Sequence, residues 1–391
     1  MTTYDAIIIG GGINGAASAF FLSRAGLRPV VVERLPALAG LTTSRSMEAM
    51  RAQFVEPENM AMMRESIAFY EHFAENTGQP GYTIGLHQQG YLFLTTEPDG
   101  PQRFRQRVAT QHGLGLTDVE FLTGDEVRQR FPYAQAEEIT AGTFRQRDGW
   151  ISAHEACFGF ARASEAPILL KNTVTAMLIE HGRVIGVETD HGPLAAPVVV
   201  VATGPYSKRV AALAGIDLPL RIIRRHRVTI GEHPLVPQNA PMVIDQDTGA
   251  HWRPEKPGAA LAWAQPQEPP GEPMDDVRPN PMFVHEVMEG VSRLCPFWID
   301  VAESLKRDQV YVSAGQYTVT PDDKPIIGPH PEIEGLFFNT GYSGHGIMGA
   351  PGGGRLLADL VAGRAYDETN PFSFRRLAAL EDAEAGHKRL L

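Results

Sequence analysis

The chain has 391 residues, 43% of them hydrophobic and 21% charged, so it is expected to fold throughout and to need more than one ordinary core. Its formal net charge of −11 gives no general attraction to nucleic acid, and no nucleic-acid partner is expected. Cys157 and Cys295 lack metal-ligand spacing and no apolar run reaches the roughly 20 residues of a bilayer span, so we predict a cytoplasmic protein without disulfide, metal site or membrane span.

The first residues predict a strand, a helix and a second strand. An apolar run at Ala6–Ile9 precedes a glycine cluster, and a helical pattern follows at Ala16–Ala25 and ends at Gly26. A second apolar run at Pro29–Val32 completes a βαβ unit of about 30 residues. This unit is typical of the start of a doubly wound parallel sheet.

The glycines between the strand and the helix predict a dinucleotide site. Gly10, Gly12 and Gly15 fit the pattern G-x-G-x-x-G. Gly10 would permit a tight turn, Gly12 a close pyrophosphate, and Gly15 close packing of helix on strand. Glu33 ends the second strand, where its carboxylate would accept hydrogen bonds from ribose hydroxyls and repel the 2′-phosphate of NADP. FAD and NAD share the adenosine diphosphate half, so these residues do not separate the two cofactors.

The remainder of the chain predicts further helices and strands. In order, they are a helix over Glu56–Glu75, a strand at Gly90–Thr96, alternating strands from Val174 with a turn at Gly182, a buried strand at Val198–Val201, a strand at Leu336–Phe338, and a helix from Pro351 to Ala362 with Pro351 in its first turn and Gly363 as its C-cap. The strands after Val174 are expected to return to the first sheet. The proline-rich residues 234–281 predict irregular loops around a few strands, on the substrate side.

One basic run, RIIRRHR at Arg221–Arg227, allows two interpretations. It is either the rim of a strand with solvated arginines or part of a site for an anionic group.

Three further segments carry a family resemblance. They are LTTSRSMEAMRAQFVEPENM at residues 41–60, VVVATGPYS at 199–207, and GQYTVTPDDKPIIGPHPEIEGLFFNTGYSGHGIMGAPGGGRLLADL at 315–360. With the N-terminal glycines, they resemble the D-amino acid oxidase superfamily of FAD enzymes along the whole chain. Within that superfamily the chain is most similar to sarcosine oxidase, dimethylglycine oxidase and the β-subunit type of L-proline dehydrogenase.

The resemblance implies an α/β fold with α+β elements. A Rossmann-like FAD-binding domain would be interleaved with a substrate domain built on a mixed β-sheet. The FAD-binding domain would comprise residues 1–80, 142–216 and 318–391, and the substrate domain residues 81–141 and 217–317.

The resemblance also implies extended FAD. The residues expected to bind it are Gly10, Gly12, Ile13, Asn14, Gly15, Glu33, Arg34, Thr43, Ser44, Arg45, Val174, Thr203, Gly204, Gly344, Gly346, Ile347 and Met348. Ser44 and Arg45 would lie beside the pyrophosphate and flavin, and Val174 would meet the adenine through its backbone. The last four precede a predicted helix, so their amides would face the flavin edge where negative charge grows on reduction.

The chain departs from sarcosine oxidase at three positions. Gly315 replaces the cysteine that anchors the flavin there, so FAD is expected to be non-covalent. Met348 replaces a lysine that helps to hold the substrate carboxylate, whereas its arginine partner is present as Arg51. Ala260 is the counterpart of a lysine that promotes reaction with oxygen, which favours a dehydrogenase over an oxidase.

The expected reaction is hydride removal from the carbon next to the nitrogen of an amino acid, giving an imine. Arg51 would hold the carboxylate with two parallel donors. His345 and Tyr317 would orient the amine or accept its proton, unless they are only loop and packing residues.

Several other residues are weaker candidates for substrate binding. Arg224 or Arg225 would assist Arg51, or else form surface salt bridges. His226, Trp252 and Trp263 would line the substrate region, or else fill the core.

Three functions stay open. The first is FAD-dependent oxidation of a secondary or N-methylated amino acid such as sarcosine, dimethylglycine or proline. The second is an FAD oxidase of glycine or D-amino acids. The third is a flavin-binding assembly or scaffold protein, because a mitochondrial member of the superfamily acts in respiratory-complex assembly and has a segment similar to Pro57–Asn59. Beyond the small amine, the expected partner is an electron-acceptor subunit or a second copy of the chain.

Overall fold

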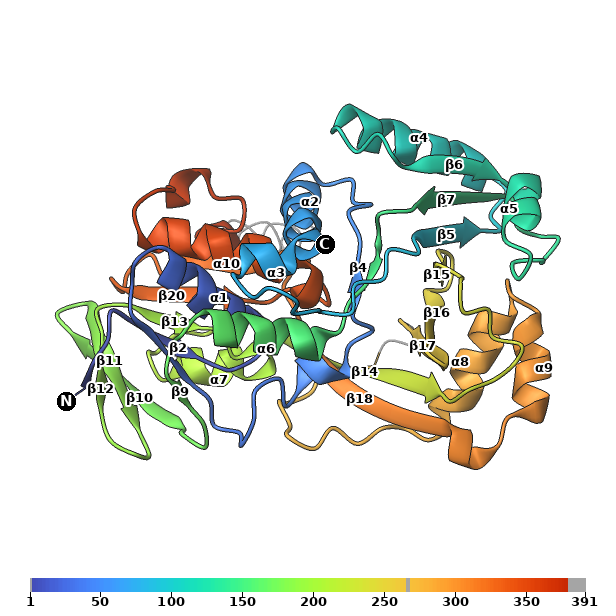
Figure 1. The fold of residues 1–391 in the computed structure, drawn as a ribbon. Coiled ribbons are helices and arrows are strands. Elements are labelled where there is room, and N and C mark those ends of the chain that lie inside the picture. Colours follow the sequence, from blue (N-terminus) through green and yellow to red (C-terminus); the bar gives the residue numbers. More distant parts are fainter. Residues whose placement is uncertain (1, 265–267, 379–391) are drawn as a thin grey trace, which may run out of the picture.

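The computed structural model describes residues 2–264 and 268–378. Their strands form sheets of six, eight, four and two strands, with helices packed around them (Figure 1). The six-stranded sheet and most helices lie in one half of the molecule, and the eight-stranded sheet lies in the other. The predicted α/β class with a mixed sheet is confirmed.

The six-stranded sheet contains the predicted βαβ unit. Its strands, in spatial order, are β19 (Ile326–Pro329), β20 (Leu336–Thr340), β13 (Val199–Val201), β2 (Ala6–Ile9), β3 (Pro29–Val32) and β9 (Ile168–Leu169). All neighbours are parallel except β19 and β20. The return of β13 to the first sheet is therefore confirmed.

Both faces of the six-stranded sheet are buried. Ile8 packs with the helices on one face, whereas Ile7 and Ile9 pack on the other with Val184 and Val187. The helices on the first face are α1 (Ile13–Arg24), α2 (Pro57–Glu71), α3 (Phe73–Asn76), α6 (Ala153–Ala163) and α10 (Gly346–Val361). Because both faces are covered, the strands read as continuous apolar runs.

A four-stranded sheet covers the second face. It consists of β1 (Thr2–Thr3), β12 (Leu194–Ala195), β11 (Arg183–Thr189) and β10 (Val174–Glu180). The predicted turn at Gly182 joins β10 to β11, with His181 and Gly182 at positive φ. The expectation that these two strands join the first sheet is wrong, because β10 pairs with β11 and β11 pairs with β12, and this separate sheet packs across the first one.

The eight-stranded sheet is antiparallel except between β15 and β5. Its strands, in spatial order, are β18 (Val310–Val319), β14 (Arg221–Ile230), β17 (Gly258–Trp263), β16 (Ala250–Glu255), β15 (Met242–Asp245), β5 (Tyr91–Thr95), β7 (Ala141–Arg145) and β6 (Glu120–Thr123). One face packs through Trp252 and Leu261 on α8 (Phe283–Ser292) and α9 (Phe297–Ser304). The opposite face is left for the site described below.

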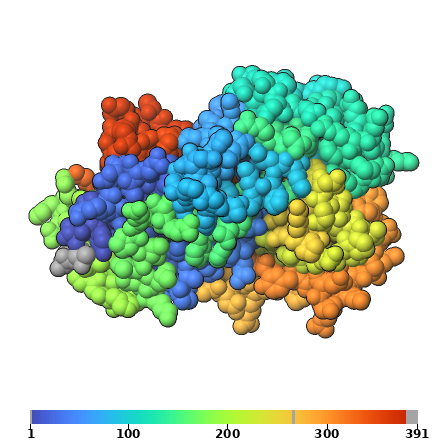
Figure 2. Space-filling model, viewed as in Figure 1, coloured from blue at the N-terminus to red at the C-terminus, as the bar shows by residue number. Residues whose placement is uncertain are grey.

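The remaining elements are short or peripheral. They are α4 (Gly100–Gly113), α5 (Gly124–Arg130), α7 (Ser207–Ala212), the two-stranded sheet of β4 (Ala49–Met50) and β8 (Gly149–Trp150), and the 3₁₀ turns η1 (Thr42–Arg45), η2 (Gly204–Tyr206), η3 (Arg307–Gln309) and η4 (Asp367–Thr369). In the space-filling view, α2 and the residues after it lie across the middle of the molecule (Figure 2).

Two predicted helices have different bounds. The helix over Glu56–Glu75 is broken at His72, whose φ of −120° and ψ of 35° are not helical. The last helix, α10, begins at Gly346 and contains Pro351 in its interior rather than in its first turn. Pro351 has no N–H to donate to the Ile347 carbonyl, and the Tyr70 hydroxyl of α2 donates to that oxygen instead, at 2.6 Å.

The five-segment division into two domains stays a prediction. Two of its boundaries, residues 141 and 317, fall inside β7 and β18 of the eight-stranded sheet. In the part of the chain that the structure describes, none of the helices has both the length and the apolar character needed to cross a bilayer.

Candidate active site

One cavity of about 750 Å³ lies between the two large sheets. The carboxyl ends of the parallel strands β2, β3, β13 and β20 open onto it, which is where doubly wound sheets bind their ligands. The opposite wall is the free face of the eight-stranded sheet, including Tyr91, Phe93 and Tyr317.

Most of the predicted site residues line this cavity. They are Gly10, Gly12, Ile13, Asn14, Glu33, Arg34, Thr43, Arg51, Val174, Thr203, Gly204, Tyr317, Gly344, His345, Gly346, Ile347 and Met348.

Three predicted residues lie outside the cavity lining. Ser44 and Arg45 are exposed, whereas Thr42 and Thr43 of η1 line the cavity, and the Thr43 hydroxyl accepts a hydrogen bond from the Ile13 N–H at 3.2 Å. The structure gives no support to their prediction as flavin contacts. Gly15 is buried beneath the lining, against Gly10.

The glycine cluster forms a tight backbone cradle. A Cβ atom at Gly15 would overlap the Gly10 carbonyl oxygen, and Gly10 itself has φ +108°. A Cβ atom at Gly12 would meet only the Thr43 hydroxyl, at 3.4 Å. Gly15 is therefore required by the packing of α1 on β2, whereas Gly12 leaves open space above the backbone.

The cradle has the polar groups that a dinucleotide requires. Gly12 is the N-cap of α1 without a side-chain cap, so N–H groups of the first turn face the cavity. Glu33 accepts hydrogen bonds from the Gly11 and Leu35 N–H groups at 2.7 and 2.8 Å, which fixes its carboxylate at the rim. The side-chain oxygens of Asn14 and Asn172 are buried without a hydrogen-bond partner among the described residues. These residues fit the adenosine diphosphate half of FAD.

A second helix N-terminus faces the same cavity. Gly346, Ile347 and Met348 form the first turn of α10, and its N-cap residue His345 makes no side-chain cap. The prediction placed these three residues before the helix, whereas they lie in its first turn. Their N–H groups therefore have no intrahelical partners. Gly344 has φ +90°, and a Cβ atom there would lie 2.6 Å from the Tyr317 ring. The turn places positive helix-dipole charge at the centre of the cavity.

Arg51 is the predicted carboxylate ligand, and its surroundings leave its charge unpaired. Its Nη1 donates to the Gln53 carbonyl at 3.0 Å, and its guanidinium stacks over Phe54 at 4.0 Å. No carboxylate of the described residues lies within 4 Å of it. Burial lowers the pKa of Arg51, and a guanidinium keeps its proton in proteins. A half-buried cation of this kind, in a cavity lining, calls for an anionic ligand.

Arg107 of α4 is a further cation of the lining, next to Arg51, and the sequence did not reveal it. Its Nη2 donates to the Gln53 carbonyl at 3.1 Å and its Nη1 to the Gln246 side-chain oxygen at 3.1 Å. The available signal was its place beside Phe104, Val108 and Gln111, the buried side chains of this helix, where a charge is unexpected.

His345 lies at the start of α10, with its ring edge-on to Phe54 at 5.2 Å between centroids. Burial, and secondarily the charge of Arg51, lower the pKa of His345 to about 3. The ring is therefore neutral near pH 7, which favours the predicted role in orienting the amine over that in accepting its proton.

The lowered pKa of His345 predicts a pH-dependent stability. The unfolded chain binds this proton below about pH 6.5 and the folded chain only near pH 3, so the stabilising contribution is present above 6.5 and is lost as the pH falls. When the pH falls from 7 to 5, the unfolding free energy of His345→Gln should therefore decrease by roughly 1–2 kcal/mol less than that of the wild type. Urea unfolding of the apoproteins at both pH values measures this, and equal losses would contradict it.

The basic run Arg221–Arg227 lies in β14, an internal strand. Arg221 is exposed, whereas Arg224 and Arg225 are half-buried and Arg227 is buried, so the solvated-rim interpretation is wrong for these three. Arg224 pairs with Glu268 at 2.6 Å, and Arg227 pairs with Glu48 and Glu255. Neither lines the cavity, and the same holds for Arg225, so their role beside the substrate stays without support.

The other weak candidates also lie away from the cavity lining. Trp252 is buried in the core against Trp298, and Trp263 donates to the Thr248 carbonyl at 2.9 Å. His226 stacks on Phe283 at 4.7 Å. Their aromatic surfaces are used in packing on α8 and α9, as the core alternative stated.

Comparison with known proteins identifies the family. The sequence matches the family model described as FAD dependent oxidoreductase over residues 5–360. It is 26% identical to FAD-dependent oxidoreductase domain-containing protein 1 of Xenopus laevis, over 96% of this chain and 83% of that protein. It is 27% identical to mitochondrial dimethylglycine dehydrogenase of Rattus norvegicus, over 91% of this chain but only 43% of that protein. Among solved structures, L-proline dehydrogenase from P. horikoshii superposes with a TM-score of 0.85 and 26% identity, over 96% of this chain and 98% of that one.

The match covers most of the chain, and the cavity has the polar groups that such a cofactor needs. The chain therefore belongs to the family of FAD-dependent oxidoreductases and is an enzyme of that family.

Proposed function

We propose that this enzyme oxidises a secondary or N-methylated amino acid, removing a hydride from the carbon next to the nitrogen to give an imine. The observation that supports this most is Arg51, a half-buried cation in the cavity lining, close to the N-terminus of α10 and without an ion-pair partner among the described residues. Similarity to dimethylglycine dehydrogenase and L-proline dehydrogenase agrees with such a substrate.

The cradle residues would hold FAD. When bound, FAD supplies an isoalloxazine ring that accepts the hydride. The N–H groups of α1 would bind the pyrophosphate and Glu33 the ribose hydroxyls. The N–H groups of α10 would stabilise negative charge as the ring is reduced.

Non-covalent binding of FAD is part of the proposal. Gly315 is buried in β18 and offers no side chain. Cys157 and Cys295 are both outside the cavity lining, and burial raises the pKa of each thiol to about 12.

The residues of the cavity would have separate roles in binding and orienting the substrate. Arg51 would fix the carboxylate through two parallel N–H donors. The neutral His345 ring would accept a hydrogen bond from the N–H of a secondary amine, which must itself be neutral to release hydride. Phe54 and Phe93 beside Arg51 would exclude water from the reacting carbon. Positioning of that carbon would supply much of the rate.

We further propose that electrons leave to an acceptor other than oxygen, such as a quinone or another protein, in the cytoplasm. Ala260, the counterpart of the oxygen-activating lysine, is buried in β17, and the described lining of the cavity contains arginines but no lysine.

Anaerobic titration of the purified holoenzyme tests the function. N-methylglycine, N,N-dimethylglycine or proline should bleach the flavin absorbance, whereas glycine and D-alanine should not. Admission of air should restore the colour slowly if oxygen is a poor acceptor. Bleaching by glycine or D-alanine alone would instead support an oxidase of primary amino acids, and a flavin that no amine reduces would support the assembly or scaffold alternative.

A further inference from the structure

We propose that the substrate carries a second carboxylate and that Arg107 binds it, so that the enzyme acts on N-substituted amino dicarboxylic acids. This inference rests on the proposed function and specifies its substrate class. Arg107 would then be a specificity-determining residue, while Arg51 holds the carboxylate next to the reacting carbon.

The ion pairs of the cavity lining give the first support. The other charged side chains of its lining have partners: Arg34 with Asp275, Arg209 with Glu272, Glu48 with Arg253, Asp245 with Arg293, and Glu33 with two backbone N–H groups. Within residues 2–264 and 268–378, Arg51 and Arg107 are the two lining groups whose charge has no such partner. Glu56 and Asp148 act on Arg51 only at longer range, and Glu56 does so on Arg107, because neither carboxylate forms an ion pair with these arginines.

The two guanidinium groups are neighbours. Both donate to the same Gln53 carbonyl, at 3.0 and 3.1 Å, and both stack on Phe93, with centroid distances of 5.5 and 5.0 Å. Burial and the nearby charge of Arg51 lower the pKa of Arg107 to about 10. A single carboxylate, with the amine neutral, would balance only one of these two charges in a cavity of low polarity.

Arg107 also has donor capacity that the protein does not use. Its Nε is buried without a hydrogen-bond partner among the described residues. Its Nη1 and Nη2 each make one hydrogen bond, to Gln246 and Gln53, and each nitrogen carries a second N–H. An unpartnered buried donor costs free energy, which a bound carboxylate would recover.

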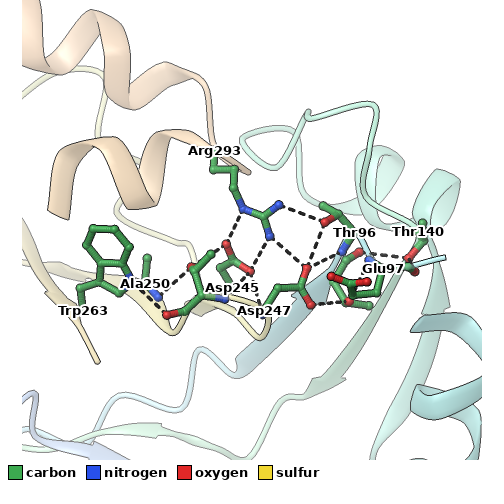
Figure 3. Close-up of polar contacts among 10 residues, drawn as sticks. Thr96, Glu97, Thr140, Asp245, Asp247, Ala250, Trp263 and Arg293 are labelled. Atoms are coloured by element: carbon green, nitrogen blue, oxygen red, sulfur yellow. Dashed lines mark hydrogen bonds and ion pairs between the residues drawn. The ribbon is translucent and has the colours of Figure 1, made fainter. Parts of the chain in front are cut away.

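The turn between β15 and β16, a hairpin that carries Gln246, is held by several ion pairs and hydrogen bonds. Gln246 lies between Asp245 and Asp247, and both carboxylates bind Arg293 of the helical layer, at 2.7 and 3.0 Å (Figure 3). Asp247 also accepts a hydrogen bond from the Thr96 N–H at 2.8 Å, which ties the hairpin to the end of β5. The Gln246 side chain is thus presented to Arg107 from a fixed backbone, as expected of a built site.

Binding of non-oxidisable acids tests the inference without turnover. Malonate, succinate and glutarate should perturb the flavin spectrum of the holoenzyme with a Kd ~10- to 100-fold lower than acetate or propionate for the best of them. Arg107→Gln should abolish this difference without weakening monocarboxylates. Arg107→Lys should restore part of it, and Arg105→Gln, which removes an exposed arginine from the same helix, should leave it intact. The wild-type comparison stands even if a variant fails to fold.

Anaerobic reduction then separates the two claims. N-methylaspartate or N-methylglutamate should reduce the flavin with a higher efficiency than N-methylglycine. Equal binding of mono- and dicarboxylates, or an equal loss of both in Arg107→Gln, would overturn the dicarboxylate site and leave the proposed function standing. Preferential binding of dicarboxylates with no reduction by any N-substituted amino acid would support the site and overturn the proposed function.

Discussion

Arg51→Met should lower kcat/KM for the best amino-acid substrate by about 100-fold or more while leaving the melting temperature of the protein unchanged or higher. The loss follows from removal of two charge-assisted hydrogen bonds to the carboxylate and of the orientation they impose. The stability effect has the opposite sign because Arg51 is half-buried without an ion-pair partner among the described residues, so an apolar side chain of similar length removes a partly desolvated charge. Anaerobic flavin reduction and thermal unfolding measure the two effects.

The matched variant for this prediction is Arg51→Lys. It keeps the charge but loses the planar fork, so it should fall between wild type and Arg51→Met in substrate affinity. Full affinity in Arg51→Met would contradict the carboxylate role. A marked loss of stability would show instead that the stacking of Arg51 on Phe54 is mainly structural.

Gly12→Ala and Gly15→Ala should have different consequences, although both glycines belong to one motif. A Cβ atom at Gly15 would overlap the backbone of Gly10, so Gly15→Ala should destabilise even the apoprotein, by about 3 kcal/mol. Gly12 has φ −79° and room for a Cβ atom, so Gly12→Ala should fold as wild type. It should bind FAD roughly 10-fold or more weakly, because the methyl group keeps the pyrophosphate from the helix N–H groups.

Unfolding of the apoproteins and titration with FAD measure these effects. The comparison requires that FAD can be released by acid ammonium sulfate and then rebound, as the non-covalent proposal expects. Flavin that stays in the precipitated protein would contradict that proposal. A Gly12→Ala protein with unchanged FAD affinity would show that the pyrophosphate does not approach at this position.

Features encoded within short stretches could be predicted from the sequence. The strand β2, the helix α1 and the strand β3 follow from one local pattern, and their glycines and Glu33 lie around the cavity. The C-terminal glycines also lie at the cavity, although Gly346, Ile347 and Met348 form the first turn of α10 instead of a loop before it.

Features that depend on distant partners could not be predicted. The earlier start of α10 is tolerated because Tyr70, far away in the sequence, satisfies the carbonyl that Pro351 leaves free. Arg224 and Arg227 of β14 pair with Glu268, Glu48 and Glu255, which no local pattern identifies. In the sequence, Arg107 resembles its exposed neighbours on α4. It differs from them only through its contacts with Gln53, Gln246 and Phe93.

The measurement that tests the central claim most directly is the rate of anaerobic flavin reduction at saturating substrate. It should be made with the best N-substituted amino acid and with the same compound deuterated at every carbon attached to nitrogen. If this chain removes a hydride from that carbon, the deuterated substrate reduces the flavin measurably more slowly. Equal rates with the two substrates, or a flavin that no amino acid reduces, would contradict the account.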